Sequence, residues 1–120
     1  MRATLDFLLH DWLRVDALLE RPRFAEHSHD TFTAVLDTCE RIAREKFAPF
    51  NRQADVEEPR FDGQQVHLPA ATHAALAAYL GSGMLAAAQD HEIGGMQLPY
   101  TREMAANAFF SKASVAMAGY

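Results

Sequence analysis

Apolar residues recur at steps of three and four along much of the chain, a spacing that places them on one face of an α-helix. The clearest pattern runs from about 29 to 50, with Ser28 or Asp30 available as the N-cap. Pro49 stands near its end, where it should distort or terminate the last turn. The apolar positions of this predicted helix are Phe32, Val35, Leu36, Cys39, Ile42, Ala43, Phe47 and Phe50.

A second helical pattern lies at the N-terminus. Between about 4 and 20, several leucines share one side of the predicted helix with Trp12 and Val15. The hydroxyl of Thr4 is available to cap its first turn, and Pro22 bounds it at the far end. We therefore expect one helix in this stretch.

Two further helices are expected in the second half of the chain. Pro69 stands at a natural first helical position, and the alanine-rich run after it has high helix propensity. Gly81 or Gly83 should stop that helix. The last apolar pattern covers about 100–120 and is expected to break around Ser111–Ser114.

Polar loops separate these helices. Residues 52–68 are acidic, carry proline and glycine and show no periodicity, which indicates a long surface connection. A second loop covers 88–99, where the Gly94-Gly95 pair marks a turn that needs a positive φ. The sequence therefore predicts an all-α fold, an up-and-down helical bundle of about four to five helices with two long loops, in one domain spanning residues 1–120.

Composition and charge narrow the function classes. The chain has 49% hydrophobic and 22% charged residues, which is close to ordinary globular usage. Its formal net charge is −5 and it has no basic stripe, which argues against a nucleic-acid partner. The single cysteine, Cys39, rules out an internal disulfide and fits a reducing compartment. Because no apolar run reaches the roughly 18 residues of a membrane helix, we expect no membrane span and a cytoplasmic protein.

The six histidines suggest a metal site only at first sight. They lie at 10, 27, 29, 67, 73 and 91, without an i,i+4 pair and without a cysteine partner nearby. A zinc site needs three or four converging ligands, so we interpret these histidines as solvent-exposed or capping residues and predict no metal site. The segment from His91 to Gly95 begins like H-E-x-x-H, but Gly95 occupies the place of the second histidine.

The other reactive side chains also have ordinary structural interpretations. Cys39 falls on the apolar face of its predicted helix, where a buried core residue is expected rather than a nucleophile. No carboxylate stands alone among apolar residues, where burial would raise its pKa to suit a general base. We therefore predict no catalytic residue and no cofactor-binding residue in this chain.

Several short motifs follow one another in an order that resembles a known family. They are Leu5-Asp6-Phe7-Leu8-Leu9, Phe47-Ala48-Pro49-Phe50-Asn51-Arg52, Tyr79-Leu80-Gly81-Ser82-Gly83 and Glu92-Ile93-Gly94-Gly95-Met96-Gln97-Leu98-Pro99. In order and spacing they resemble the N-terminal helical domain of the acyl-CoA dehydrogenase family, in particular its large bacterial branch. Two positions depart from that pattern: Ile93 replaces the tyrosine usual before Gly-Gly, and Met84 stands where an aromatic residue often follows the glycine.

The resemblance implies a flavoenzyme with a helical N-terminal, a β middle and a helical C-terminal domain. It implies that FAD lies mainly between the middle and C-terminal domains. There a glutamate removes the α-proton of an acyl-CoA thioester, a hydride passes to the flavin, and an electron-transferring flavoprotein accepts the electrons. FAD and the catalytic base are therefore not expected on this chain alone. By the same alignment, Ser114–Tyr120 lies nearest the acyl-chain pocket, with Met117 and Tyr120 as the candidate pocket residues.

These observations lead to two main functional hypotheses. In the first, residues 1–120 are the N-terminal part of a longer acyl-CoA dehydrogenase-like oxidoreductase. They would pack against its middle and C-terminal domains and supply part of the acyl-chain pocket. In the second, the chain is a stand-alone, non-catalytic helical interaction or oligomerisation module. A third hypothesis is independent binding of a fatty-acyl ligand between the helices. Apolar surface left without a partner domain leads us to expect self-association.

Overall fold

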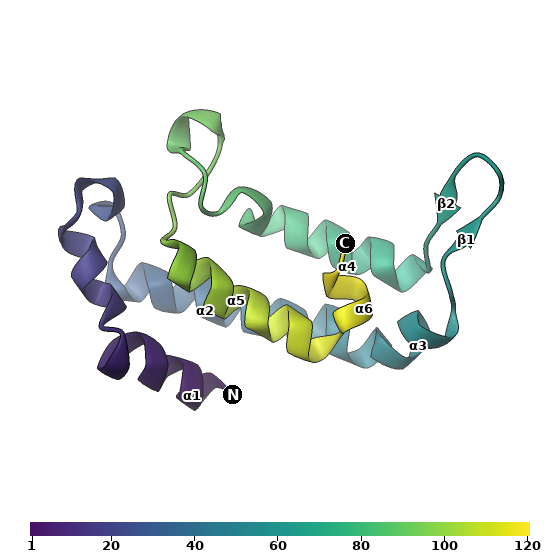
Figure 1. The fold of residues 1–120 in the computed structure, drawn as a ribbon, viewed down its shortest axis with the longest axis horizontal. Helices are drawn as coiled ribbons and strands as arrows, with labels where there is room; N and C mark the ends of the chain where they lie inside the picture. The colour runs from purple at the N-terminus through teal and green to yellow at the C-terminus, as the bar shows by residue number, and fades with distance from the viewer.

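A computed structural model describes residues 1–120 and consists almost entirely of helices (Figure 1). The α-helices are α1 (Arg2–Asp6), α2 (His29–Ile42), α3 (Asn51–Val56), α4 (Ala70–Gly81), α5 (Tyr100–Ala113) and α6 (Val115–Ala118). A single antiparallel hairpin, β1 (Arg60–Phe61) and β2 (Val66–His67), interrupts them. The predicted all-α class is confirmed. None of the helices combines the length and the hydropathy needed to cross a membrane.

The three longest helices, α2, α4 and α5, form a flat layer two helices deep: α5 lies over α2, and α4 runs beside them (Figure 1). Successive helices run in opposite directions. The Cα extents are 51 × 33 × 17 Å and the radius of gyration is 16.1 Å, against about 13–14 Å for a compact chain of this length. Only 21 of the 120 residues are buried. The molecule is therefore flatter than a closed helical bundle, and much of its apolar surface faces outward.

Helix α2 confirms the clearest sequence prediction. The backbone N–H of Thr31 donates to the Ser28 hydroxyl at 3.2 Å, and the N–H of Ser28 donates back to the Thr31 hydroxyl at 2.7 Å. This reciprocal capping satisfies two N–H groups that the first turn leaves free. At the other end Pro49 distorts the helix as predicted. A π-helical turn, Ala43–Phe47, and a 3₁₀ turn, Ala48–Phe50, lead into α3.

The N-terminal stretch is not the single helix that its periodicity predicts. Helix α1 begins at Arg2 without a side-chain cap, so the predicted Thr4 cap is wrong, and it continues as a π-helical turn over Phe7–Trp12. The chain then breaks at Arg14, whose φ is +50°, and resumes as a 3₁₀ turn over Val15–Glu20. The break buries Val15 and leaves Trp12 69% exposed, so the apolar pattern does not form one continuous stripe.

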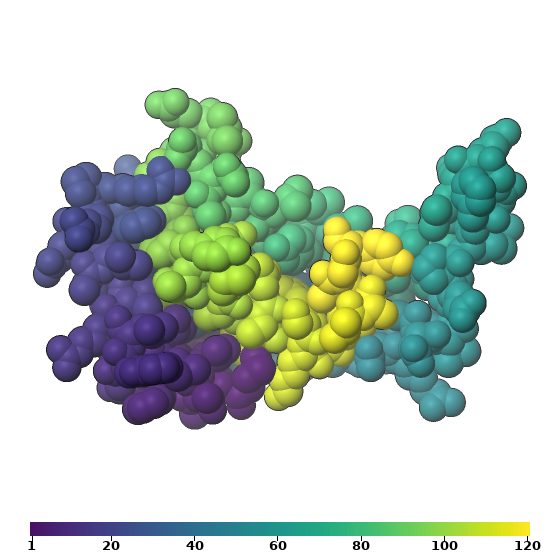
Figure 2. All heavy atoms as spheres, in the orientation of Figure 1, coloured from purple at the N-terminus to yellow at the C-terminus, as the bar shows by residue number.

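The polar connection at 52–68 contains more structure than predicted. Its first residues belong to α3, and its second half folds as the hairpin that projects from one end of the molecule (Figure 2). The carboxylate of Asp62 accepts the backbone N–H groups of Gln64 and Gln65 at 2.9 Å each, and Gly63 between them has φ +101°. This Asx turn reverses the chain without apolar burial, so hydrophobic periodicity could not reveal it.

The two later helices match the sequence more closely. Helix α4 ends at Gly81, and Gly83 then adopts φ +81°, as expected for a glycine stop. Pro69 flanks α4 as its N-cap and is not its first residue. The predicted break in the last helix falls at Ser114, whose hydroxyl accepts the N–H of Met117 at 3.4 Å and caps α6.

The Gly94-Gly95 turn needs glycine at each position for a different reason. Gly94 has φ +85°, which confirms the predicted positive φ. Gly95 lies so close to Gln89 that an added Cβ would overlap the carbonyl carbon and oxygen of that residue. Gly81, by contrast, has open space around it and no positive φ.

Gly95→Ala should therefore lower the free energy of unfolding by about 2–4 kcal/mol, because the turn must move away from the Gln89 backbone. Gly94→Ala should cost about 1–2 kcal/mol through its left-handed backbone alone. The control Gly81→Ala should be neutral or slightly stabilising, since it reduces the entropy of the unfolded chain. Urea unfolding followed by circular dichroism measures all three, and equal effects at 94 and 95 would contradict this account of the turn.

Candidate functional site

A cavity of about 270 Å³ lies where α4, α5 and α6 meet. Both candidate pocket residues from the sequence, Met117 and Tyr120, line it. Met117 is buried, whereas Tyr120 is 60% exposed at the rim. The break at Ser114 makes this possible, because it turns α6 away from the axis of α5 and across the helical layer (Figure 1).

The inner wall of the cavity is aromatic. The rings of Phe47 and Phe110 lie 4.9 Å apart, and Tyr79 meets Phe110 edge-on at 5.1 Å, both favourable arrangements for aromatic pairs. The Tyr79 hydroxyl donates to the side-chain oxygen of Asn107 at 3.3 Å. Burial raises the pKa of Tyr79, and the nearby Glu103 adds to the shift, so the hydroxyl stays protonated.

The chemistry of this cavity suits an apolar group. Eight of its ten lining residues are hydrophobic and none carries a charge. FAD, the cofactor that the family resemblance implies for a complete enzyme, does not fit here. Its pyrophosphate is anionic and needs donors or cations, and the cavity is smaller than the roughly 300–1,000 Å³ of typical small-molecule sites. A hydrocarbon chain or an apolar side chain of another domain fits better.

Cys39 is a core residue, as the sequence predicts. Its side chain is buried on α2, and burial raises the pKa of the thiol to about 11. A thiol with that pKa is protonated at neutral pH and is a poor nucleophile or metal ligand.

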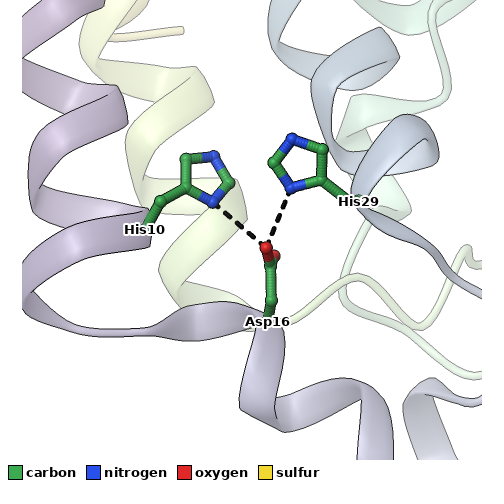
Figure 3. Close-up of side chains that lie close together, drawn as sticks. All are labelled: His10, Asp16 and His29. Atoms are coloured by element: carbon green, nitrogen blue, oxygen red, sulfur yellow. Dashed lines mark hydrogen bonds and ion pairs between the residues drawn. The ribbon is translucent and has the colours of Figure 1, made fainter.

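At the opposite end of the α2–α5 pair, three polar side chains converge from three different segments (Figure 3). His10 comes from the π-helical turn, Asp16 from the 3₁₀ turn and His29 from the first position of α2. The Nδ1 atoms of His10 and His29 lie 3.2 Å and 2.8 Å from the same oxygen, Oδ2 of Asp16. The two imidazole rings lie with their centroids 4.5 Å apart and their planes tilted by 49°. We call these three residues the His–Asp cluster.

Behind the His–Asp cluster lies Arg102, which is completely buried. Its Nη2 donates to Oδ1 of Asp16 at 2.9 Å, and its guanidinium lies 4.5 Å from the centre of the Phe32 ring. The Nε and Nη1 groups have no hydrogen-bond partner in the protein. A buried cation that keeps two donors unpaired is costly, so its contact with Asp16 is the main compensation for its burial.

The same contacts set the charge state of Asp16. Burial alone would raise the pKa of this carboxyl, but the hydrogen bond from His29 and the attraction of His10 and Arg102 hold it below its ordinary value of 3.8. Burial lowers the pKa of Arg102, and Asp16 opposes that effect. An arginine starts from so high a pKa that it remains a cation. Asp16 and Arg102 therefore form an ion pair at neutral pH.

The spacing of residues along the sequence could not predict the His–Asp cluster. His10 and His29 lie six and thirteen positions from Asp16, and the three residues belong to different segments. The sequence prediction of exposed or capping histidines holds for His29, while His10 is half-buried. One feature of the sequence could have predicted the ion pair between Arg102 and a carboxylate. Helical periodicity places Arg102 on the same side of the last helix as the buried Ala105, Ala106 and Phe109, and a cation in that stripe needs a carboxylate partner.

Comparison of the chain with protein-family models, with curated proteins and with solved structures gives no match. The geometry of the cavity and of the His–Asp cluster, together with the motifs of the sequence, is therefore what supports a functional assignment.

Asp16→Asn should destabilise the protein by about 2–4 kcal/mol, because it leaves the buried Arg102 cation without an anion. The pKa of Asp16 is lowered in the folded protein, so its contribution to the free energy of unfolding depends on pH. That contribution is complete above the ordinary aspartate pKa of 3.8 and is lost as the pH falls through the lower pKa of the folded protein. The variant should therefore lose less stability than the wild type as the pH falls below about 4.

The exposed Asp55, which lies on α3, provides the control for this test. Asp55→Asn should change the free energy of unfolding by less than about 0.5 kcal/mol, as usual for a surface site. Denaturant unfolding at several pH values measures both variants. An Asp16→Asn protein as stable as the Asp55→Asn protein would mean that Arg102 is not held by this carboxylate.

Proposed function

We propose that this chain is the N-terminal helical domain of an acyl-CoA dehydrogenase-like protein and that it forms one wall of the acyl-chain pocket. The observation that carries the proposal is the uncharged cavity beside α6, because it contains both Met117 and Tyr120, the residues that the family resemblance points to. The ordered motifs of the sequence and the all-helical architecture agree with it. The catalytic base and the main flavin contacts would lie in the middle and C-terminal domains.

In this proposal the chain contributes apolar surface and shape. Phe47 and Phe110 would contact the hydrocarbon part of the substrate, and each square ångström of apolar surface removed from water contributes about 25 cal/mol. The cavity is open at its rim, where Tyr120 and Leu85 are 60% and 69% exposed. A second domain packed against this rim would close the pocket and exclude water.

A second surface would serve interdomain packing. Phe7, Trp12 and Leu13 from the N-terminal segment are each more than half exposed, although all three are large and apolar. The three lie within seven positions of one segment, and neighbouring exposed apolar side chains commonly mark interaction surfaces. We call these three residues the N-terminal apolar surface. Its exposure, with the thinness of the helical layer, favours a chain that packs against another domain or another copy.

The proposal is tested in the protein encoded by the complete reading frame, with acyl-CoA oxidation followed through an artificial electron acceptor. Tyr120→Ala should raise the KM for long-chain acyl-CoA about fivefold to tenfold, because it removes about 1–1.5 kcal/mol of apolar contact. The KM for short-chain substrates should change much less. The control Val66→Ala, on the exposed hairpin, should leave both values unchanged. Absence of thioester oxidation, or an equal effect on all chain lengths, would contradict the proposal.

The isolated 120-residue chain tests the packing role separately. It should bind an apolar fluorescent dye and associate in light scattering, because the N-terminal apolar surface has no partner there. Trp12→Gln combined with Leu13→Gln should reduce both signals by more than half. Ile93→Gln removes one exposed apolar residue elsewhere and should have little effect. A compact monomer that binds no dye would instead support the stand-alone module.

A further inference from the structure

We propose that His10, Asp16 and His29 bind a divalent transition metal, with Zn²⁺ as the best-suited ion. The three residues offer two imidazole nitrogens and one carboxylate oxygen, and these ligand atoms all lie within 4.8 Å of one another. The proposal concerns the His–Asp cluster at the start of α2 and is independent of the acyl-chain cavity beside α6.

The geometry is close to what a zinc ion requires. Zinc lies about 2.0–2.2 Å from nitrogen and oxygen ligands in a tetrahedral site, so neighbouring ligand atoms are roughly 3.3 Å apart. Here the Nδ1 atoms lie 3.2 Å and 2.8 Å from Oδ2 of Asp16. Both rings already point toward this oxygen (Figure 3). Binding would require the carboxylate to move slightly away from the rings and the two imidazole nitrogens, which lie within 4.8 Å of each other, to come to roughly 3.3 Å. Each coordinating nitrogen must also be free of its proton, and His10 Nδ1 must turn from Arg102 Nη2, which lies 3.5 Å away.

Arg102 positions the carboxylate of Asp16 within the His–Asp cluster. It holds Oδ1 of Asp16 at 2.9 Å and leaves Oδ2 facing the histidines, so the carboxylate is fixed in the orientation that a metal would use. Hydrogen bonds of this kind to a ligating group typically change metal affinity by about 10–100-fold. The other two guanidinium groups, Nε and Nη1, are buried without a partner. Because they are hydrogen-bond donors they cannot coordinate a cation, so only the Nη2 contact with Asp16 supports the metal site.

The guanidinium also limits the affinity. Its positive charge neutralises much of Asp16 and opposes a second cation nearby, so the site should be weaker than a structural zinc centre with four ligands. The donor set selects the class of metal. Two imidazoles favour Zn²⁺, Cu²⁺ or Ni²⁺, whereas Mg²⁺ and Ca²⁺ prefer oxygen ligands throughout. Three protein ligands would leave one position for water or a further ligand.

An ion can reach the site from solvent. The side chains of His10, Asp16 and His29 are 22%, 37% and 57% exposed, so the open face belongs mainly to His29. The chain also contains two simpler histidine–carboxylate pairs, His67 with Asp62 and His91 with Glu26. Each of these offers only two ligands, which makes them matched internal controls for adventitious binding.

The test is calorimetric titration of the tag-free, chelator-treated chain with ZnCl₂. We expect one Zn²⁺ per chain, an increase in Tm with added Zn²⁺, and no comparable response to MgCl₂ or CaCl₂. His29→Ala should weaken binding about tenfold or more, and His10→Ala should do the same. His67→Ala should bind as the wild type does. Circular dichroism of each variant without metal confirms that it is folded.

His29→Ala is the decisive variant, because this side chain is exposed and the Ser28–Thr31 cap of α2 does not depend on it. The proposal would be overturned if His29→Ala left Zn²⁺ binding unchanged and His67→Ala reduced it. That result would assign the ion to the surface pair of His67 and Asp62. Absence of binding at millimolar Zn²⁺ would overturn the proposal as well. Neither result affects the acyl-CoA assay, which reports on the other end of the molecule.

Discussion

One buried cation, Arg102, ties the N-terminal segment to the α2–α5 pair, and Arg2 adds partly exposed ion pairs to Asp37 and Glu40 on α2. The guanidinium of Arg102 has lost all contact with water, and its partners come from parts of the chain far from α5: Phe32 on α2, and Asp16 between the π-helical turn and α2. A buried charge is tolerated only when it is paired, so Asp16 must reach this position. The break at Arg14 allows it to do so and places His10 and His29 around the same carboxylate.

The α2–α5 pair separates two regions of different chemistry. Near the start of both helices lies the His–Asp cluster with its charges, and near their far end lies the uncharged aromatic cavity beside Phe110 and Met117. The layer is thin, which leaves both regions open to solvent or to another protein surface. This arrangement explains why a chain with so few buried residues contains two distinct places where binding is physically reasonable.

Local features of the sequence predicted several elements correctly. Apolar spacing predicted the helix after Ser28 and the break near Ser114, the alanine-rich run predicted the helix after Pro69, and the Gly-Gly pair predicted the positive φ of Gly94. Local features failed where contacts between distant residues or side-chain hydrogen bonds decide the structure. The hairpin is closed by Asp62 hydrogen bonds rather than by apolar contacts, and the N-terminal helix breaks where the Asp16–Arg102 pair is made. Met117 and Tyr120 were named from a family resemblance, and the cavity that joins them depends on the turn at Ser114. The residues of the His–Asp cluster come from three separate segments, so no local sequence pattern predicts that they lie together.

The central claim, that Arg102 holds the N-terminal segment on the α2–α5 pair, is tested most directly by amide hydrogen exchange of an Arg102→Met protein. Asp16 lies partly in solvent and can be hydrated when its partner is lost, so the helices themselves should persist. We expect faster exchange throughout residues 2–20 and nearly unchanged protection in α4 and α5. Unchanged protection of residues 2–20, or an equal loss across every helix, would contradict the account.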